Sequence, residues 1–378
     1  MTNTLNLAFI GGGINSAVGR AHFIASQMDK NFQVVSGFFS RDKKINLLTG
    51  KTWNIDKKRI YENLDKFIEN EKNRIDAVAL LSPTTDHYTV LKKLVRNKIP
   101  IICEKSFTRD EKEASEICKL AKKYNAYISL VYNYTGYPMI RELRQLIRSG
   151  FFGKIINVII DMPQEGYISV DQKNKAYRLQ HWRLKDYGIP TISLDLGIHL
   201  YHMLRFLIKD EPHSATSVEN SYGNFKNLID DVKCLIKLEN KATASLWYSK
   251  SALGNRNGLS VNIFGTKVSA KWQQNQPEML KLNYKNGEKT IIDRASHLTK
   301  HASKDRYSRF KVGHPAGFVE AFANMYWDIS DDLKYFKRNG IKKNSEFVFY
   351  EDQGLEGLNF LKKISVSSKK NNWIKLKN

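Results

Sequence analysis

Residues 5–13, Leu5-Asn6-Leu7-Ala8-Phe9-Ile10-Gly11-Gly12-Gly13, decide the fold of this chain. A short apolar run with the pattern of a buried strand ends abruptly in three consecutive glycines. The stretch from Ala17 to Met28 that follows has the character of a helix. A strand, a glycine turn and a helix in this order begin a βαβ unit.

The same alternation continues to about residue 131. It predicts strands at 32–39, 77–81, 99–103 and 126–131 and helices at 87–97 and 110–124. Short connections between alternating strands and helices indicate right-handed βαβ units on a parallel sheet. We therefore expect an α/β fold that begins with a Rossmann domain, a doubly wound parallel sheet, over residues 1–130.

The pattern changes after residue 130. A helix at 140–149 precedes a strand at 155–160, and another helix is expected at about 190–208. Strand signals then follow one another in hairpin fashion, at 231–238, 242–248, 259–264 and 270–272. This pattern predicts a C-terminal α+β domain over residues 131–378, with an open, largely antiparallel sheet for substrate binding and oligomerisation.

The composition is that of a globular protein with a basic surface. The 378 residues include 61 Lys+Arg and 38 Asp+Glu, which gives a net charge of +23. The lysines are scattered and interleaved with acids, a pattern that argues against nucleic-acid or membrane partners and favours a solvated surface that keeps the protein in solution, with attraction of small anionic ligands as the alternative. The sequence shows neither an apolar run of about 18 residues nor a leader pattern, and its three cysteines have unrelated spacings, so we expect a cytoplasmic protein.

The glycine turn predicts a dinucleotide site, because glycines let main-chain N–H groups approach a pyrophosphate at a helix N-terminus. The usual Gly-x-Gly-x-x-Gly pattern would place a glycine at Ser16, but the next one is Gly19. The turn is therefore three residues longer than usual, and a plain strand-to-helix turn stays an alternative. The residues of this turn expected to contact the cofactor are Gly11, Gly13, Ile14 and Asn15.

The end of the second strand bears on the choice between NAD and NADP. A basic or hydroxyl residue there tolerates the 2′-phosphate of NADP, whereas an acid favours NAD. The sequence reads Ser40-Arg41-Asp42. Ser40 and Arg41 favour NADP slightly, and Asp42 keeps NAD open.

Four further motifs give this chain a family resemblance. They are Leu81-Ser82-Pro83-Thr84-Thr85-Asp86-His87, Ile102-Cys103-Glu104-Lys105-Ser106, Trp182-Arg183 and Asp195-Leu196-Gly197-Ile198-His199. In this order, behind the glycine turn, they resemble the Gfo/Idh/MocA family, the relatives of glucose-fructose oxidoreductase and inositol dehydrogenase. The resemblance runs from about residue 5 to residue 373. It implies a Rossmann domain, a Glu-Lys-Pro motif at a strand end and an Asp-x-Gly-x-His motif on a helix of the second domain.

The chain departs from the family pattern at three positions. Ser106 replaces the proline of Glu-Lys-Pro, which leaves a cis peptide at that point open. Thr135 stands where the family's Asn-Tyr-Arg-x-x-Pro segment has arginine, and His202 stands where an acid is often found. Substrate contacts that depend on those family residues do not carry over.

The catalytic residues predicted from these motifs are a lysine, a carboxylate and an imidazole. Lys105 follows an apolar strand, so it should lie at the carboxyl end of the sheet, although a surface lysine paired with Glu104 is the alternative. Asp195 and His199 are four residues apart on an expected helix and should face the same way. By the resemblance, His199 or Lys105 is the general acid/base for a carbinol, and Asp195 orients its hydroxyls.

Loops around these motifs supply the remaining expected contacts. After the expected strands at 77–81 and 99–103, the residues expected to contact the cofactor are Ser82, Pro83, Thr84, His87, Glu104 and Lys105. For His87, capping or packing is the alternative. The expected substrate contacts come from Tyr167, Trp182, Arg183, His202 and His314. Asp195, His199 and His202 also have a spacing that could present metal ligands, but the sequence shows no fourth ligand, and we expect no metal.

These observations predict an NAD(P)-dependent oxidoreductase. It would transfer a hydride between a nicotinamide cofactor and a ring carbinol or ketone of a sugar, cyclitol or sugar derivative, as a homodimer or homotetramer. One alternative is the same chemistry on a nucleotide-linked sugar. The other is a dinucleotide-binding regulator without catalysis, since a Rossmann fold alone proves no activity.

Overall fold

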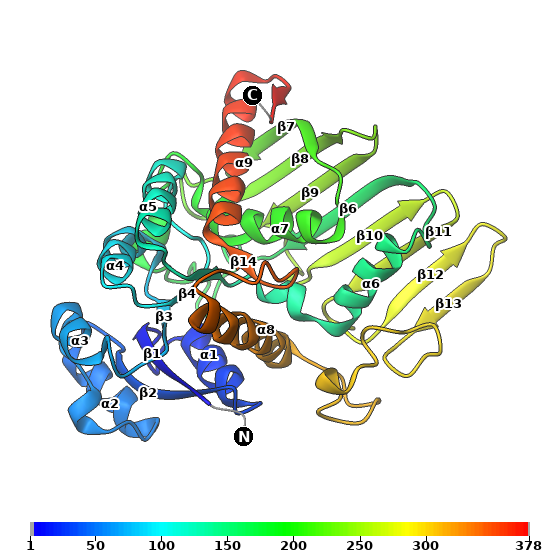
Figure 1. Ribbon diagram of the computed structural model, residues 1–378. Coiled ribbons are helices and arrows are strands. Elements are labelled where there is room, and N and C mark those ends of the chain that lie inside the picture. The colour runs from blue at the N-terminus through cyan, green and yellow to red at the C-terminus, as the bar shows by residue number, and fades with distance from the viewer. Residues whose placement is uncertain (1–3, 377–378) are drawn as a thin grey trace. The chain divides into compact units, whose positions relative to one another are not determined.

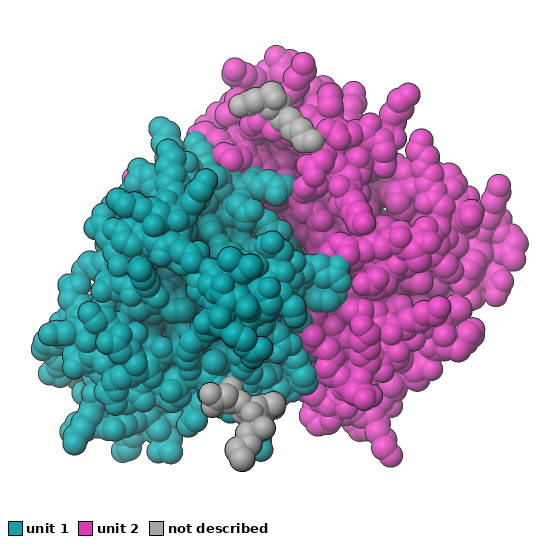
Figure 2. All heavy atoms as spheres, in the orientation of Figure 1, with its two compact units in different colours: residues 1–136, 318–356 teal, residues 137–317, 357–378 magenta. Residues whose placement is uncertain are grey.

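The computed structural model describes residues 4–376, and the chain divides into two compact units. Unit 1 comprises residues 1–136 and 318–356, and unit 2 comprises residues 137–317 and 357–378 (Figure 2). We expected one boundary, between residues 130 and 131. That expectation does not describe this division, because a segment from the last quarter of the chain folds back into unit 1.

Unit 1 is built on a sheet with the strand order β14-β5-β4-β3-β1-β2. Its strands are β1 (Leu5–Gly11), β2 (Phe32–Phe38), β3 (Ala77–Leu81), β4 (Ile101–Cys103), β5 (Ile128–Leu130) and β14 (Phe349–Tyr350). All neighbours are parallel except β14, which pairs antiparallel with β5. The order 2-1-3-4-5 is a common doubly wound topology, and its ligand-binding crevice lies where the order reverses, at the carboxyl ends of β1 and β3.

The parallel sheet confirms the predicted Rossmann fold. Its helical elements are α1 (Ala17–Gln27), α2 (Lys43–Thr52), η1 (Lys57–Arg59), α3 (Leu64–Glu71), α4 (Thr84–Arg96), α5 (Glu111–Tyr124), η2 (Asn133–Gly136) and α8 (Phe318–Asn339). Local sequence sets their ends: Asp110 caps α5 by accepting from the N–H groups of Lys112 and Glu113 at 3.0 and 2.9 Å, and Asn125 ends it in a left-handed conformation.

Helix α8 completes the core of unit 1. Its residues Phe322, Tyr326, Ile329 and Leu333 recur at helical spacing and are buried with Phe9 of β1 in one hydrophobic cluster. The helix packs beside α1, and the two lie next to each other in Figure 1. Local sequence pattern did not predict this helix, because the residues that bury its apolar face lie about 300 positions upstream in the chain.

Unit 2 contains a second sheet, with the order β13-β12-β11-β10-β6-β9-β8-β7-β15 in the described part of the chain. Its strands are β6 (Ile155–Pro163), β7 (Pro212–Asn220), β8 (Asp231–Leu238), β9 (Thr243–Ser249), β10 (Ser260–Gly265), β11 (Val268–Gln273), β12 (Leu280–Tyr284), β13 (Lys289–Ile292) and β15 (Ile374–Lys375). Among these strands, only β6 and β9 pair in parallel. The expectation of an open, largely antiparallel sheet is confirmed.

Helices cover one face of this sheet (Figure 1). The helical elements of unit 2 are α6 (Pro138–Arg148), η3 (His181–Leu184), the π-helical turn η4 (Ser193–Gly197), α7 (Ile198–Leu207), η5 (Asp305–Tyr307) and the 357–370 part of α9 (Glu351–Lys370). Strand β8 alternates between buried Val232, Cys234 and Ile236 and exposed Lys233, Leu235 and Lys237, as a sheet with one covered face requires. Within residues 4–376, no helix combines the length and hydropathy of a membrane span.

Candidate active site

The glycine turn brings the end of β1 against two other segments of unit 1. Gly11 and Gly12 have φ of +80° and +69°, which glycine tolerates best. A Cβ at Gly11 would lie 2.6 Å from the main-chain nitrogen of Ser82, and a Cβ at Gly19 would overlap the carbonyl oxygen of Gly12. Gly19 thus provides the close helix–strand packing of the third glycine in a dinucleotide turn, three residues later than the usual spacing.

The first turn of α1 fits the pyrophosphate of a dinucleotide. Ser16 caps the helix by accepting from Gly19 N–H at 3.0 Å, whereas the N–H groups of Ala17 and Val18 have no acceptor within the helix, as in any first helical turn. Both residues are exposed, so an anion can reach them. The N–H of Ile14 donates to Thr49 Oγ1 of α2 at 3.0 Å, which ties the lengthened turn to the neighbouring helix.

At the end of β2, the three residues that bear on cofactor choice have different partners. Asp42 uses its carboxylate to cap α2, accepting from Ile45 N–H at 3.0 Å. Ser40 Oγ accepts from Asp42 N–H at 3.1 Å. The Arg41 side chain is 77% exposed, and its Nη2 lies 3.3 Å from Asp86 Oδ2. The Asp42 carboxylate thus has a main-chain partner in α2, whereas the guanidinium of Arg41 has only a surface ion pair.

The Glu104-Lys105 motif is anchored by a buried hydrogen-bond chain. Glu104 Oε2 accepts from Lys105 N–H at 3.1 Å, and Oε1 lies 2.9 Å from His22 Nε2. His22 Nδ1 lies 2.6 Å from the hydroxyl of Tyr326 on α8. The peptide between Lys105 and Ser106 is cis, which the sequence left open. These hydrogen bonds link α1 and α8 to the loop that follows β4. Glu104 thereby holds the main chain of Lys105.

His87 is completely buried, so the expected contact with the cofactor is replaced by a packing role. Its Nε2 lies 2.9 Å from the carbonyl oxygen of Ser82, and its Nδ1 lies 2.9 Å from that of Ser106. Burial lowers the pKa of the imidazole, against weaker opposing effects of these carbonyls and Glu104. His87 therefore joins the loop after β3 to the loop after β4 and holds Ser82, Pro83 and Thr84 beside the glycine turn.

In unit 2, Asp195 is the centre of a buried ionic cluster. Its Oδ2 contacts both Arg183 Nη1 and Lys250 Nζ, and its Oδ1 accepts from Arg183 Nη2 at 3.4 Å. Arg183 lies over the ring of Trp182, 4.5 Å from the centroid, and Lys250 lies 5.0 Å from the centroid of Tyr167. Three of the expected site residues of unit 2, Tyr167, Trp182 and Arg183, are therefore gathered around Asp195.

Tyr167 is buried, with 2% of its surface exposed. Burial raises the pKa of its hydroxyl to about 12, and the nearby Arg183 opposes this effect. The phenol is therefore protonated near neutral pH and remains a hydrogen-bond donor. A carboxylate, two cations and an indole in one cluster can hydrogen-bond to and stack on a polyol, whereas the hydroxyl oxygen of Tyr167 is itself buried.

The helix expected at 190–208 begins at Thr191 and contains the π-helical turn η4, which includes Asp195, and His199 follows in α7. The glycine between them is required by packing, because a Cβ at Gly197 would lie 2.7 Å from Tyr248 Cζ. Ser193 Oγ lies 2.8 Å from the hydroxyl of the same tyrosine. Single π-turns within helices often occur at functional sites.

Two family models match this chain in sequence. Residues 5–132 match the model described as "Oxidoreductase family, NAD-binding Rossmann fold", and residues 140–271 match the GFO/IDH/MocA C-terminal domain. The chain belongs to the GFO/IDH/MocA family. It is therefore an oxidoreductase of an NAD-binding family, and the resemblance drawn from its motifs is confirmed.

Individual relatives extend over most or all of the chain. The uncharacterized oxidoreductase YfiI of Bacillus subtilis is 27% identical and is matched over 100% of this chain and 98% of its own length. The glucose-6-phosphate 3-dehydrogenase of the same organism is 25% identical over 73% of this chain and 76% of its own. The crystal structure of an inositol dehydrogenase homolog from Azotobacter vinelandii, complexed with NADH and myo-inositol, shares the fold with a TM-score of 0.89 at 21% identity, covering 99% of this chain and 98% of its own.

His202, an expected substrate contact in this family member, is instead a packing residue. It is 1% exposed, and a Cβ at Gly357 of α9 would lie 2.5 Å from its Nε2. Burial lowers the pKa of its imidazole to about 3, and Arg205 contributes in the same direction. Within the described residues, no three His, Cys, Asp or Glu side chains are grouped to hold a metal ion, so the alternative of a metal on Asp195, His199 and His202 gains no support.

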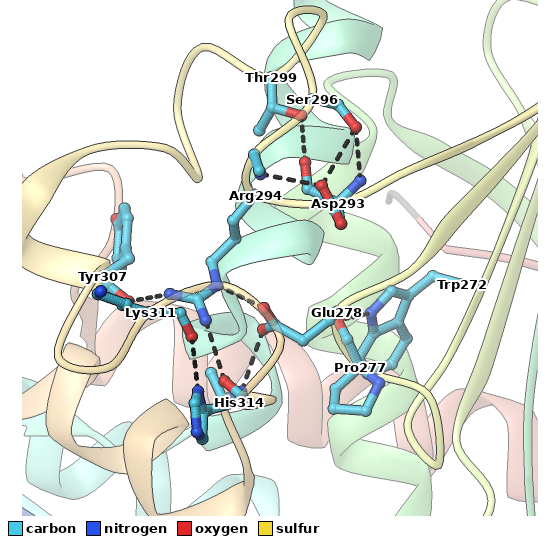
Figure 3. Close-up of polar contacts among 12 residues, drawn as sticks. Trp272, Pro277, Glu278, Asp293, Arg294, Ser296, Thr299, Tyr307, Lys311 and His314 are labelled. Carbon is cyan, nitrogen blue, oxygen red and sulfur yellow. Dashed lines mark hydrogen bonds and ion pairs between the residues drawn. The ribbon is translucent and has the colours of Figure 1, made fainter.

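His314 lies on the long loop between β13 and α8 (Figure 3). Its carbonyl oxygen accepts from Arg294 Nη2 at 3.2 Å, and its ring nitrogen Nδ1 lies 3.3 Å from the carbonyl of Lys311. Arg294 is buried, forms an ion pair with Glu278 and donates to the carbonyl of Tyr307 at 2.6 Å. These contacts fix the loop and belong to a different cluster from the one around Asp195.

Sequence reasoning missed three residues that complete the two clusters. His22 and Tyr326 support Glu104, and Lys250 contacts Asp195. His22 lies three residues after Gly19 on α1, and Lys250 directly follows β9. The end of a central strand is a signal that could have drawn attention to Lys250, whereas Tyr326 required the position of α8.

Proposed function

We propose that this protein oxidises a ring carbinol, or reduces a ring ketone, of a sugar, cyclitol or sugar derivative with a nicotinamide cofactor. The observation that carries the proposal is the turn at the end of β1, where close packing at Gly11 and Gly19 sets the first turn of α1 beside the strand end. The polar and aromatic cluster around Asp195 supports a polyol ligand. The name of the relative glucose-6-phosphate 3-dehydrogenase describes oxidation of a sugar.

The catalytic residues in this proposal are Lys105, Asp195 and His199. When bound, a nicotinamide accepts or supplies a hydride. In the oxidative direction the carbinol carbon loses that hydride, and its hydroxyl proton passes to Lys105 or His199 as general base. Asp195, fixed by Arg183 and Lys250, accepts hydrogen bonds from substrate hydroxyls. Glu104 maintains Lys105 in position through the main-chain contact at 3.1 Å.

A cofactor-binding and turnover assay tests this function. Fluorescence titration with NADH and NADPH should show binding, and a panel of sugars, sugar phosphates, cyclitols and nucleotide-linked sugars should include members that change the nicotinamide absorbance. Turnover confined to nucleotide-linked sugars would favour the alternative in which the same chemistry acts on a nucleotide-linked sugar. Cofactor binding with no turnover across the panel, in either direction, would favour the dinucleotide-binding regulator.

We infer a preference for NADP over NAD from the end of β2. Arg41 is exposed and its contact with Asp86 is a surface ion pair, which costs little to rearrange around a 2′-phosphate. Asp42, the residue that could select NAD, caps α2. The R41A variant should lose affinity for NADPH by about tenfold and retain its affinity for NADH. Equal losses for both cofactors would contradict the preference.

We also propose that the uncovered face of the unit 2 sheet joins copies of this chain into a homodimer or homotetramer. Val218, Leu235 and Phe264 are exposed apolar side chains of β7, β8 and β10 whose strand neighbours face inward. Light scattering should give two or four times the chain mass of 43.7 kDa, and L235K should lower it. A monomeric wild type would refute the proposal.

The free thiols of Cys103, Cys118 and Cys234 fit the expected cytoplasmic location.

A further inference from the structure

Lys250 is an interior lysine whose position is fixed by its main chain. It directly follows β9, in the middle of the unit 2 sheet. Its N–H donates to the carbonyl of Asp230 at 2.7 Å, and its own carbonyl accepts from Tyr167 N–H at 2.8 Å. The side chain is 9% exposed. Hydrogen bonds on both sides therefore set the direction from which the ammonium group approaches the Asp195 cluster.

Burying an ammonium group is unfavourable unless charged and polarisable groups replace its water. Asp195 Oδ2 supplies the opposite charge, and the face of Tyr167, 5.0 Å away, supplies a cation–π contact. Lys250 is thus directed at Asp195 by the geometry of the cluster.

Arg183 contacts the same carboxylate from the η3 segment. Two cations anchored on different segments, one after a central strand and one on a loop, meet at Oδ2 and fix the rotation of the carboxyl group. Removing one of them takes away one of these two restraints on Asp195. The carboxylate would then lose the fixed orientation that a set of substrate hydroxyls requires, because small misplacements of positioned groups weaken binding.

We propose that Lys250 is a positioning residue for polyol recognition, acting through the orientation of the Asp195 carboxylate. This inference rests on the proposed function. An interaction formed with the substrate hydroxyls in both ground and transition states raises KM when it is lost, with a smaller effect on kcat. Lys250 therefore governs polyol affinity and leaves cofactor affinity unchanged.

The test uses K250M and K250R with a polyol that the wild type turns over. K250M should raise KM for the polyol about tenfold or more, change kcat less than threefold and leave the dissociation constant of NAD(P)H within twofold. K250R, which keeps the charge, should recover most of the loss. K289M removes an exposed lysine on β13 and should behave as wild type.

A double-mutant cycle separates positioning from a structural role. If Lys250 acts through Asp195, K250M should add little to the KM of D195N, because coupled residues are not additive. An unchanged KM in K250M, or full additivity with D195N, would overturn the inference; if K250M does not fold, K250Q serves instead. If the wild type turns over no polyol, the proposed function fails and this inference fails with it.

Discussion

At the scale of single residues, the chain surrounds its candidate catalytic groups with buried partners. Glu104 holds the main chain of Lys105 and is itself held by His22, which contacts Tyr326. A buried carboxylate is tolerated only with such partners, so the network keeps this loop in one conformation. The positions of His22 and Lys250 show that supporting residues can lie far in sequence from the motifs that they serve.

Replacing Lys105 tests its assignment as a proton-transferring group. K105A should lower kcat by about 100-fold or more, because positioned general acid–base groups contribute on that order. The dissociation constant of NAD(P)H, measured by fluorescence titration, should stay within about threefold of wild type. K122A removes an exposed lysine of α5 and is the matched control. Turnover retained in K105A would refute the assignment.

At the scale of elements, helix α1 depends on its close approach to β1. G19A places a methyl group where the carbonyl oxygen of Gly12 lies, so α1 or the glycine turn must move. We expect a loss of about 1–3 kcal/mol in the free energy of unfolding and about tenfold or greater weakening of NAD(P)H binding. Urea unfolding and fluorescence titration measure the two effects.

The control for this substitution is G258A, since a Cβ at Gly258 meets no atom within 4 Å. Both its stability and its cofactor affinity should match those of wild type. If G19A bound the cofactor normally, the role given to the lengthened glycine turn would be wrong.

The contact between β7 and α9 makes stability depend on pH. Burial raises the pKa of Glu219 from its usual value to about 7, and the hydroxyl of Ser365, at 3.2 Å from Oε2, opposes this only in part. Because the folded state binds the proton more tightly than the unfolded chain, this stabilisation is full below about pH 4.5 and is lost as the pH rises through about 7.

E219Q removes this dependence. Above pH 8 the variant should be more stable than wild type by about 1 kcal/mol, a value reduced for partial solvent screening, and near pH 4.5 the difference should vanish. Thermal unfolding across this pH range measures it. E288Q, in the exposed turn between β12 and β13, should show no such trend. An equal difference between E219Q and wild type at every pH would contradict the explanation.

At the scale of the whole molecule, sequence reasoning succeeded where local pattern decides structure. The strand-turn-helix at residues 5–27 and the bounds of β8 followed from periodicity and turn residues. It did not predict the parts of the fold that depend on contacts between residues far apart in the sequence. Residues 318–356 were assigned to the second domain, but α8 packs beside α1 with its apolar face in the hydrophobic cluster of unit 1, and β14 pairs with β5.

In the candidate site, too, some residues are recognisable from local motifs, whereas the surroundings of others come from distant segments of the chain. The glycine turn, Glu104, Lys105 and Asp195 stand in motifs that a sequence displays directly. The burial of His87 and His202 depends on carbonyls and a glycine contributed by other segments, so the polar type of these residues suggested contacts that the fold does not offer. The π-helical turn at Asp195 likewise depends on packing of Gly197 against Tyr248.

Hydride transfer between a nicotinamide cofactor and a ring carbinol can be followed with a deuterium label. The enzyme is incubated with NADPH or NADH in which both hydrogens at carbon four are replaced by deuterium, together with the keto form of an active polyol, and the product is examined by mass spectrometry and NMR. We expect one deuterium per product molecule, bound to the carbinol carbon, and formation of this product slowed by about 100-fold or more when K105A replaces the wild type. Consumption of the cofactor without deuterium in the product would contradict the proposed hydride transfer.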